Sequence, residues 1–227
     1  PYISHSVRNH ILKLPNYRYI TFSVNNSTIR LHIFYENSID DFLKIIPNYI
    51  YFMYQLSDFQ KQTTFYYYLT DCKKIAKHKI LTQDEVNTGS TNMNTGVITI
   101  WRKQEVYKTT IHELIHRMGL DGFHVDMLDF YKQRYGITSK HLLVNEAVTD
   151  FWAILMNVYL TVKLLNLSYR EFLTYVQAER MFVLYQAQKM LSLNRDWNRY
   201  THVFSYYIVK GELFQNLPLT LKKMNHQ

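Results

Sequence analysis

The sequence predicts an α+β protein in which a mixed half of strands and helices precedes an all-helical half. Runs rich in β-branched and aromatic residues occur up to about residue 102, and the helical period of 3.6 residues dominates after that point. Six glycines and four prolines in 227 residues are few, which favours long helices over many turns. Hydrophobic residues make up 47% of the chain, and no repeat or linker divides it. We therefore expect one domain over residues 1–227, with a strand-containing half at 1–119 and a helical half at 120–227.

Five strands are expected in the first half, at residues 17–24, 27–35, 63–71, 85–91 and 96–102. Asn25-Asn26 separates the first two strands, which is a typical hairpin signal. The turn "NMNT" separates the last two strands in the same way.

A helix is expected over residues 38–59, with Ser38 as its N-cap and with Asp40 and Asp41 in its first turn. Pro47 lies inside this segment and is expected to kink or split the helix. A second helix is expected from about residue 104 to Gly119, which suits the position after a helix C-terminus.

The second half is predicted to be helical at residues 125–134, 140–166, 168–192 and 201–216. Ser168 and Glu171 form a capping box at the start of the third of these helices. The most apolar stretch, 151–167, is interrupted by Asn157 and Lys163 and is shorter than a bilayer span, so we expect a buried helix and no transmembrane segment.

The formal net charge is +8, but the basic residues are scattered and form no stripe with aromatic residues, so no specific nucleic-acid partner is expected. The single cysteine, Cys72, excludes an internal disulfide and fits a reducing compartment. No signal peptide is recognised, so an intracellular location is favoured. The chain begins at Pro1 rather than Met, and further residues are expected upstream.

Residues 112–116 read His-Glu-Leu-Ile-His. On a helix, His112 and His116 project from one face at a separation that allows two imidazoles to share a Zn²⁺ ion. Glu113 lies about 100° around the helix, where it could take a proton from a water on the metal. The neighbouring residues are apolar, so the helix is expected to be buried, and a buried His-Glu-His set indicates a function.

A catalytic zinc site needs a third protein ligand. His124 and His141 are candidates, but neither has a spacing or context that marks it as a ligand. Glu146 is the stronger candidate, because Asp150 follows one helical turn later on the same apolar helix. Two such carboxylates repel each other unless a cation or hydrogen-bond donors hold them, and zinc beside Glu146 with an imidazole N–H at Asp150 would do so.

His-Glu-x-x-His followed by Asn-Glu-x-x-x-Asp resembles the gluzincin class of zinc metallopeptidases, of which thermolysin is the best-known example. The resemblance covers about residues 85–150 and implies a zincin-like fold. It implies that His112, His116 and Glu146 ligate one zinc ion per chain and that Glu113 is the general base.

The resemblance also implies a second layer around the metal, in which Asp150 orients His112 and Asn145 supports the site. One departure is the spacing of 29 residues between His116 and Glu146, which is longer than in the resembled enzymes and is expected to include an extra helix.

In the resembled enzymes an antiparallel edge strand lies along the cleft and pairs with the substrate. By position, the strand around Asn87, Thr88, Gly89 and Ser90 has that role here. A donor for the substrate oxyanion is expected from the helical half, and His202 is chosen over Tyr206 and Tyr207.

The sequence therefore predicts a zinc-dependent peptidase with a polypeptide substrate. One alternative is a peptidase-fold subunit that has no catalytic activity and serves as a structural or binding component of a larger assembly. A second alternative is a zinc-dependent hydrolase of a non-peptide amide, which would not need the edge strand.

Overall fold

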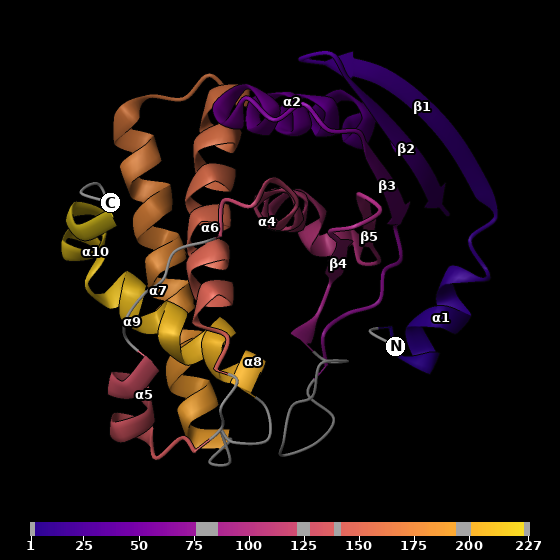
Figure 1. The fold of residues 1–227 in the computed structure, drawn as a ribbon. Coiled ribbons are helices and arrows are strands. Elements are labelled where there is room, and N and C mark those ends of the chain that lie inside the picture. The colour runs from indigo at the N-terminus through magenta and orange to yellow at the C-terminus, as the bar shows by residue number, and fades with distance from the viewer. Residues whose placement is uncertain (1–2, 76–85, 122–127, 139–141, 194–200, 225–227) are drawn as a thin grey trace. The chain divides into compact units, whose positions relative to one another are not determined.

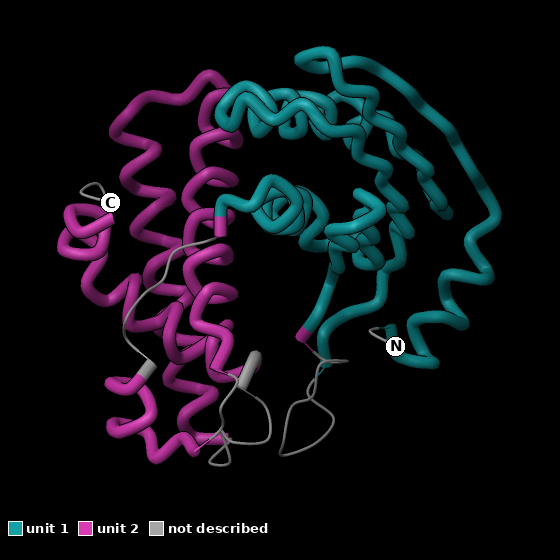
Figure 2. The backbone as a smooth tube through the Cα atoms, viewed as in Figure 1, with its two compact units in different colours: residues 1–75, 87–120 teal, residues 76–86, 121–227 magenta. Residues whose placement is uncertain are grey.

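The computed structural model describes residues 3–75, 86–121, 128–138, 142–193 and 201–224 (Figure 1). The chain forms two compact units (Figure 2). The first unit contains residues 1–75 and 87–120, and the second contains residues 76–86 and 121–227. Strands and helices are both present, and the α+β class is confirmed.

The first unit is built on a five-stranded mixed sheet in the order β1-β2-β3-β5-β4. Its strands are β1 (Asn16–Val24), β2 (Ser27–Tyr35), β3 (Thr63–Tyr68), β4 (Gly89–Asn92) and β5 (Val97–Ile100). β1 with β2 and β4 with β5 are antiparallel, whereas β3 pairs in parallel with both β2 and β5. A strand occurs at each of the five predicted places, but β3 ends at Tyr68 rather than residue 71, β4 begins at Gly89 rather than residue 85, and β5 is shorter than predicted. β4 is at an edge of the sheet.

The hairpin between β1 and β2 turns at Asn25 and Asn26, which both have positive φ angles (47° and 63°). Asparagine tolerates this left-handed conformation better than most residues, and tight hairpin turns require it at both central positions. The sequence signal and the backbone geometry therefore agree.

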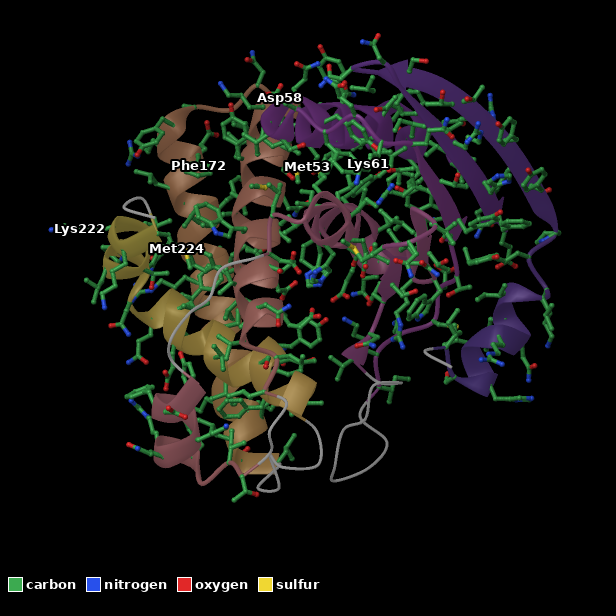
Figure 3. All side chains as sticks on the ribbon, viewed as in Figure 1. Met53, Asp58, Lys61, Phe172, Lys222 and Met224 are labelled. Atoms are coloured by element: carbon green, nitrogen blue, oxygen red, sulfur yellow. The ribbon has the colours of Figure 1, made fainter. Side chains whose placement is uncertain are left out.

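Helix α2 (Asp40–Ser57) differs from the sequence prediction at two points. Ile39 is at the N-cap position, and the Ser38 hydroxyl, one residue earlier, donates to the Asp40 carboxylate at 2.8 Å and accepts from the Asp40 N–H at 3.4 Å. The helix also runs without a break through Pro47, so of the predicted kink or split the split is wrong, and the kink stays a prediction. Buried residues of α2 lie on both sides of the proline, and they include the fully buried Met53 (labelled in Figure 3). This packing holds the helix continuous through Pro47.

Helix α4 (Val106–Met118) carries the His-Glu-x-x-His motif and follows a short 3₁₀ turn, η1 (Lys103–Glu105). Gly119 ends it with a φ of 68°, as predicted, and its N–H bonds to the carbonyl of His116. A hydrogen bond of 3.1 Å between the Tyr67 hydroxyl and Thr110 Oγ1 links β3 to α4. The strand residues of this core are fully buried: Ile29, Leu31, Ile33, Phe65, Tyr67, Ile98 and Ile100. The unit also contains α1 (His5–Ile11).

The described elements of the second unit are helical: α5 (Leu128–Tyr135), α6 (Val144–Leu164), α7 (Tyr169–Leu193), α8 (Thr201–Phe204), the π-helical turn η2 (Ser205–Val209), α9 (Lys210–Gln215) and α10 (Leu217–Met224). The Ser168–Glu171 capping box is confirmed, since the backbone N–H of Ser168 donates to the Glu171 carboxylate at 2.8 Å. The predicted helix at 201–216 is interrupted by the π turn, and α10 was not predicted. An extra helix, α5, does lie between the two sequence motifs.

Within the described residues, α6 is the helix that is long and apolar enough, by length and composition alone, to cross a membrane. However, 56% of its most apolar window is buried inside the structure, where Phe151 and Ile154 pack with Val183 and Phe214. A core helix of a globular protein passes the same test, so α6 is weak evidence for a membrane span.

Candidate metal centre

The two histidines of the motif meet on one face of α4. Their Nε2 atoms are 3.1 Å apart, and the ring planes are inclined by 75°. His112 is buried with 6% of its surface exposed, and His116 is partly buried. The four-residue spacing therefore brings the two imidazole Nε2 atoms next to each other, as the sequence predicts.

Glu113 is buried on the same helix, with 6% of its surface exposed, and faces the edge strand β4. The hydroxyl of Thr91 lies 2.7 Å from Glu113 Oε2 and 3.0 Å from the Glu113 carbonyl oxygen, and can donate to either. A buried carboxylate without a donor is costly, and this hydroxyl supplies one.

Gly89 makes room for the Glu113 side chain. A Cβ atom at this position would lie 2.6 Å from Glu113 Oε1 and 2.8 Å from Thr109 Cγ2, closer than real Cβ contacts come. Gly89 and Thr91 are two residues apart on β4, so both face α4. A glycine is thus required at residue 89 by the placement of the carboxylate beside it.

The start of β4 is tied to the start of α4 by a polar cluster around Glu105. The Glu105 carboxylate accepts from Thr88 Oγ1 at 2.9 Å and from Lys74 Nζ at 2.5 Å. Burial raises the pKa of Glu105, but Lys108, Lys74 and the Thr88 bond outweigh it and lower the pKa to about 2. Thr88 therefore has an anchoring contact, in addition to its predicted substrate-binding role.

The remaining predicted substrate-binding residues also lie at this edge. Asn87 precedes β4 and is partly buried, with an Oδ1 atom that has no hydrogen-bond partner among the described residues. Ser90 is on β4 opposite Thr99 of β5. In the part of the sheet that the structure describes, β4 pairs with β5 alone.

In the second unit, Glu146 and Asp150 lie one turn apart on α6, and each has a donor from the segment that contains η2 and α9. Tyr206 donates its hydroxyl to Glu146 Oε2 at 2.7 Å, and Lys210 Nζ donates to Asp150 Oδ2 at 2.5 Å. Asp150 has only 3% of its side chain exposed. These donors hold both carboxylates within the second unit, so the repulsion between them does not by itself require a metal ion. Asn145 is partly buried in the same first turn of α6.

His202 belongs to helix α8, but its side chain lies outside the described part of the chain, so its oxyanion role stays a prediction. The two weaker ligand candidates, His124 and His141, also lie outside the described residues.

The donor set fits zinc. His112, His116 and Glu146 together offer two imidazole nitrogens and one carboxylate oxygen, a group that could hold a metal ion. Two nitrogens at zinc-bond length in a tetrahedral site are about 3.3–3.4 Å apart. The observed 3.1 Å is within about 0.3 Å of that value, and it also suits an N–H···N hydrogen bond between the rings in the metal-free chain.

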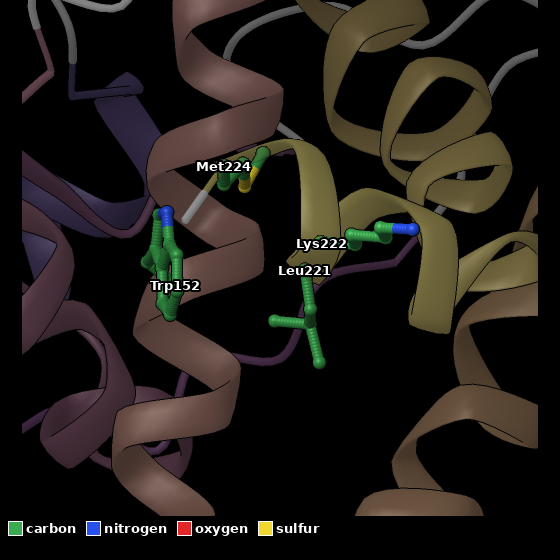
Figure 4. Close-up of a pocket in the computed structure, with 4 residues that line it drawn as sticks. All are labelled: Trp152, Leu221, Lys222 and Met224. Carbon is green, nitrogen blue, oxygen red and sulfur yellow. The ribbon is translucent and has the colours of Figure 1, made fainter. Parts of the chain in front are cut away.

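A separate hollow of about 380 Å³ lies in the second unit between α6 and α10. Trp152, Leu221, Lys222 and Met224 line it, as Figure 4 shows. Its lining is mostly apolar and includes none of the predicted site residues.

Four contacts of the site residues were not anticipated from the sequence, namely those of Thr91, Gly89 (as a steric requirement), Tyr206 and Lys210. The alternation of residues along β4 could have indicated Thr91, because it shares a face with Gly89. Nothing in the sequence marks Lys210, since its partner is 60 residues away.

No model of a known protein family matches the chain, and a comparison with curated proteins finds no match.

Proposed function

We propose that this protein is a zinc-dependent peptidase of the gluzincin type with a zincin-like fold. The observation that carries the proposal is the arrangement on α4, where two imidazole Nε2 atoms lie 3.1 Å apart and a buried carboxylate follows the first histidine. A helix that buries His112 and Glu113 beside a partly buried His116 needs a compensating function, and metal-assisted hydrolysis supplies one.

His112 and His116 would hold one zinc ion together with Glu146 of the second unit. Zinc supplies Lewis acidity, which lowers the pKa of a water and polarises a carbonyl oxygen. The fourth position would stay open for water or substrate, as in catalytic zinc sites.

Glu113 would accept the proton of the attacking water and pass it to the leaving amine. Its side chain is held for this task by the Thr91 hydroxyl and by the space that Gly89 leaves. A general base must be fixed in position, because a displacement of about 1 Å costs about 100-fold in rate.

The edge strand β4 would bind an extended polypeptide by backbone hydrogen bonds, with Asn87, Thr88, Gly89 and Ser90 along the substrate. This feature favours a peptide over a small non-peptide amide. Asp150 would orient His112 while it also accepts the bond from Lys210.

The test compares Glu113→Gln with the wild-type chain in three measurements: bound zinc, melting temperature and hydrolysis of a broad peptide library. We expect the variant to lose hydrolysis and to keep its zinc and its melting temperature. Glu36→Gln, which changes an exposed glutamate to the same residue, is the matched control and should hydrolyse as the wild type does.

A wild-type chain that binds no zinc would refute the proposal. A chain that binds zinc but cleaves no peptide would favour the alternative of a structural or binding subunit. The Tyr206 and Lys210 contacts give that alternative some support, because they hold Glu146 and Asp150 without a metal.

A further inference from the structure

The segment formed by η2 and α9 provides one hydrogen-bond donor for each of the two carboxylates of α6. Tyr206 and Lys210 are four residues apart, and so are their partners Glu146 and Asp150. Each contact joins residues 60 positions apart in the chain, so the two segments run in the same direction where they meet. These two contacts, one helical turn apart, fix the register of the η2–α9 segment against α6.

The local backbone supports this register. The π-helical turn buries Ser205, Ile208 and Val209, and it is followed by Gly211 on α9. A Cβ atom at Gly211 would lie 2.7 Å from the Cβ of Ala187, so α9 packs closely on α7 at this point. π-Helical turns are rare and are frequent at functional sites.

The contact between Lys210 and Asp150 is a buried ion pair. Lys210 and Asp150 have 12% and 3% of their side chains exposed. A buried Asp needs a compensating charge, and Lys210 Nζ supplies it at 2.5 Å from Asp150 Oδ2. Lys210 therefore fixes the segment that presents Tyr206, while Tyr206 is the residue that touches Glu146.

We propose that Tyr206 is a positioning residue that holds Glu146 as a one-oxygen metal ligand. This inference rests on the proposed zinc site. The Tyr206 hydroxyl bonds Oε2, so that an ion would meet the other oxygen of the carboxylate. A partner of this kind orients a ligand before the metal binds and fixes how many of its atoms bind.

The experiment measures the zinc affinity of the full chain by competition with a chromophoric chelator. Tyr206→Phe removes the hydroxyl and keeps the ring, and we expect it to weaken zinc binding about 10–100-fold. Tyr135→Phe is the matched control, because Tyr135 also donates to a glutamate, Glu212, at 2.5 Å in the same unit. The control should change zinc affinity less than about threefold.

A second readout uses Co²⁺ in place of zinc. If Tyr206→Phe releases Oε2 to bind the ion as well, the coordination number rises and the visible absorption of Co²⁺ weakens. A purely structural role of the hydroxyl would leave the Co²⁺ spectrum as it is in the wild type.

Glu146→Gln separates this inference from the proposed function. If Glu146→Gln binds zinc as the wild type does, the assignment of the third ligand fails and the proposed site fails with it. If Glu146→Gln weakens binding but Tyr206→Phe changes neither affinity nor the Co²⁺ spectrum, only the role of Tyr206 is overturned. The role is also overturned if metal-free Tyr206→Phe melts well below metal-free Tyr135→Phe, since the hydroxyl would then support the fold rather than the ligand.

Discussion

Replacing Gly89 by alanine tests whether the edge strand β4 fixes the position of Glu113, the proposed general base. The new Cβ atom would lie 2.6 Å from Glu113 Oε1, 2.8 Å from Thr109 Cγ2 and 3.0 Å from Glu113 Cγ. Ordinary contacts of a Cβ begin at 3.4 Å, so the carboxylate has to move by about 0.8 Å. The Thr91 bond to Oε2 limits this movement, because it holds the other oxygen at 2.7 Å.

The expected size of the effect follows from this displacement. In the proposed peptidase, a displacement of the general base Glu113 by almost 1 Å should lower the rate of hydrolysis about 100-fold. Inserting a methyl group into a packed site costs about 1–3 kcal/mol in the free energy of unfolding. Zinc content should stay near that of the wild type, because the three atoms nearest to the new methyl belong to Glu113 and Thr109 and not to the histidines.

The assay measures peptide hydrolysis, bound zinc and denaturant unfolding for Gly89→Ala. It also includes the double variant with Thr109→Ser, which removes the Cγ2 methyl. We expect the second change to restore part of the stability and none of the hydrolysis, since the clash with Glu113 stays. Wild-type hydrolysis and stability in Gly89→Ala would refute the idea that the glycine makes room for the carboxylate.

Three further predictions follow from the same structure. In the proposed peptidase, Thr91→Val should lower kcat about tenfold without loss of zinc, because the Glu113 carboxylate loses the Thr91 hydroxyl as a donor, and steady-state kinetics with metal analysis would show it. The lowered pKa of Glu105 predicts a contribution to the free energy of unfolding that is full above about pH 4.5 and is lost as the pH falls toward 2. After allowance for the partial exposure of the carboxyl group, this contribution is about 1–2 kcal/mol. Glu105→Gln should therefore flatten the loss of stability at acid pH in unfolding titrations. His202→Ala should lower kcat about 10²–10³-fold with little change in zinc affinity if His202 donates to the oxyanion, and equal kcat values would exclude that role.

The sequence predicted the elements whose signals are local. Asn25-Asn26 and Gly119 have positive φ angles, and these residue types tolerate them, so the hairpin and the end of α4 could be inferred directly. Ser38 misled because the helix begins one residue later than its N-cap signal indicates, and Pro47 did not split the helix although an interior proline costs about 3 kcal/mol, since buried residues lie on both sides of it.

The candidate site divides in the same way. The His112–His116 pair depends on helix geometry alone, so its convergence was predictable. The contacts of Tyr206 and Lys210 depend on a π turn and on a partner helix 60 residues away, and a period of 3.6 residues predicts neither. His202 is preferred to Tyr206 on the sequence because the chain has 20 tyrosines, so a single tyrosine is more often a packing residue; the Tyr206 contact with Glu146 is long-range and has no local signal.

The close approach of Gly89 to Glu113 also constrains how this chain can drift over generations. A lineage that keeps the glutamate must keep glycine at residue 89, because any larger residue displaces the carboxylate. A lineage that shortens residue 113 is then free to accept side chains at residue 89. The two positions should therefore change together or not at all.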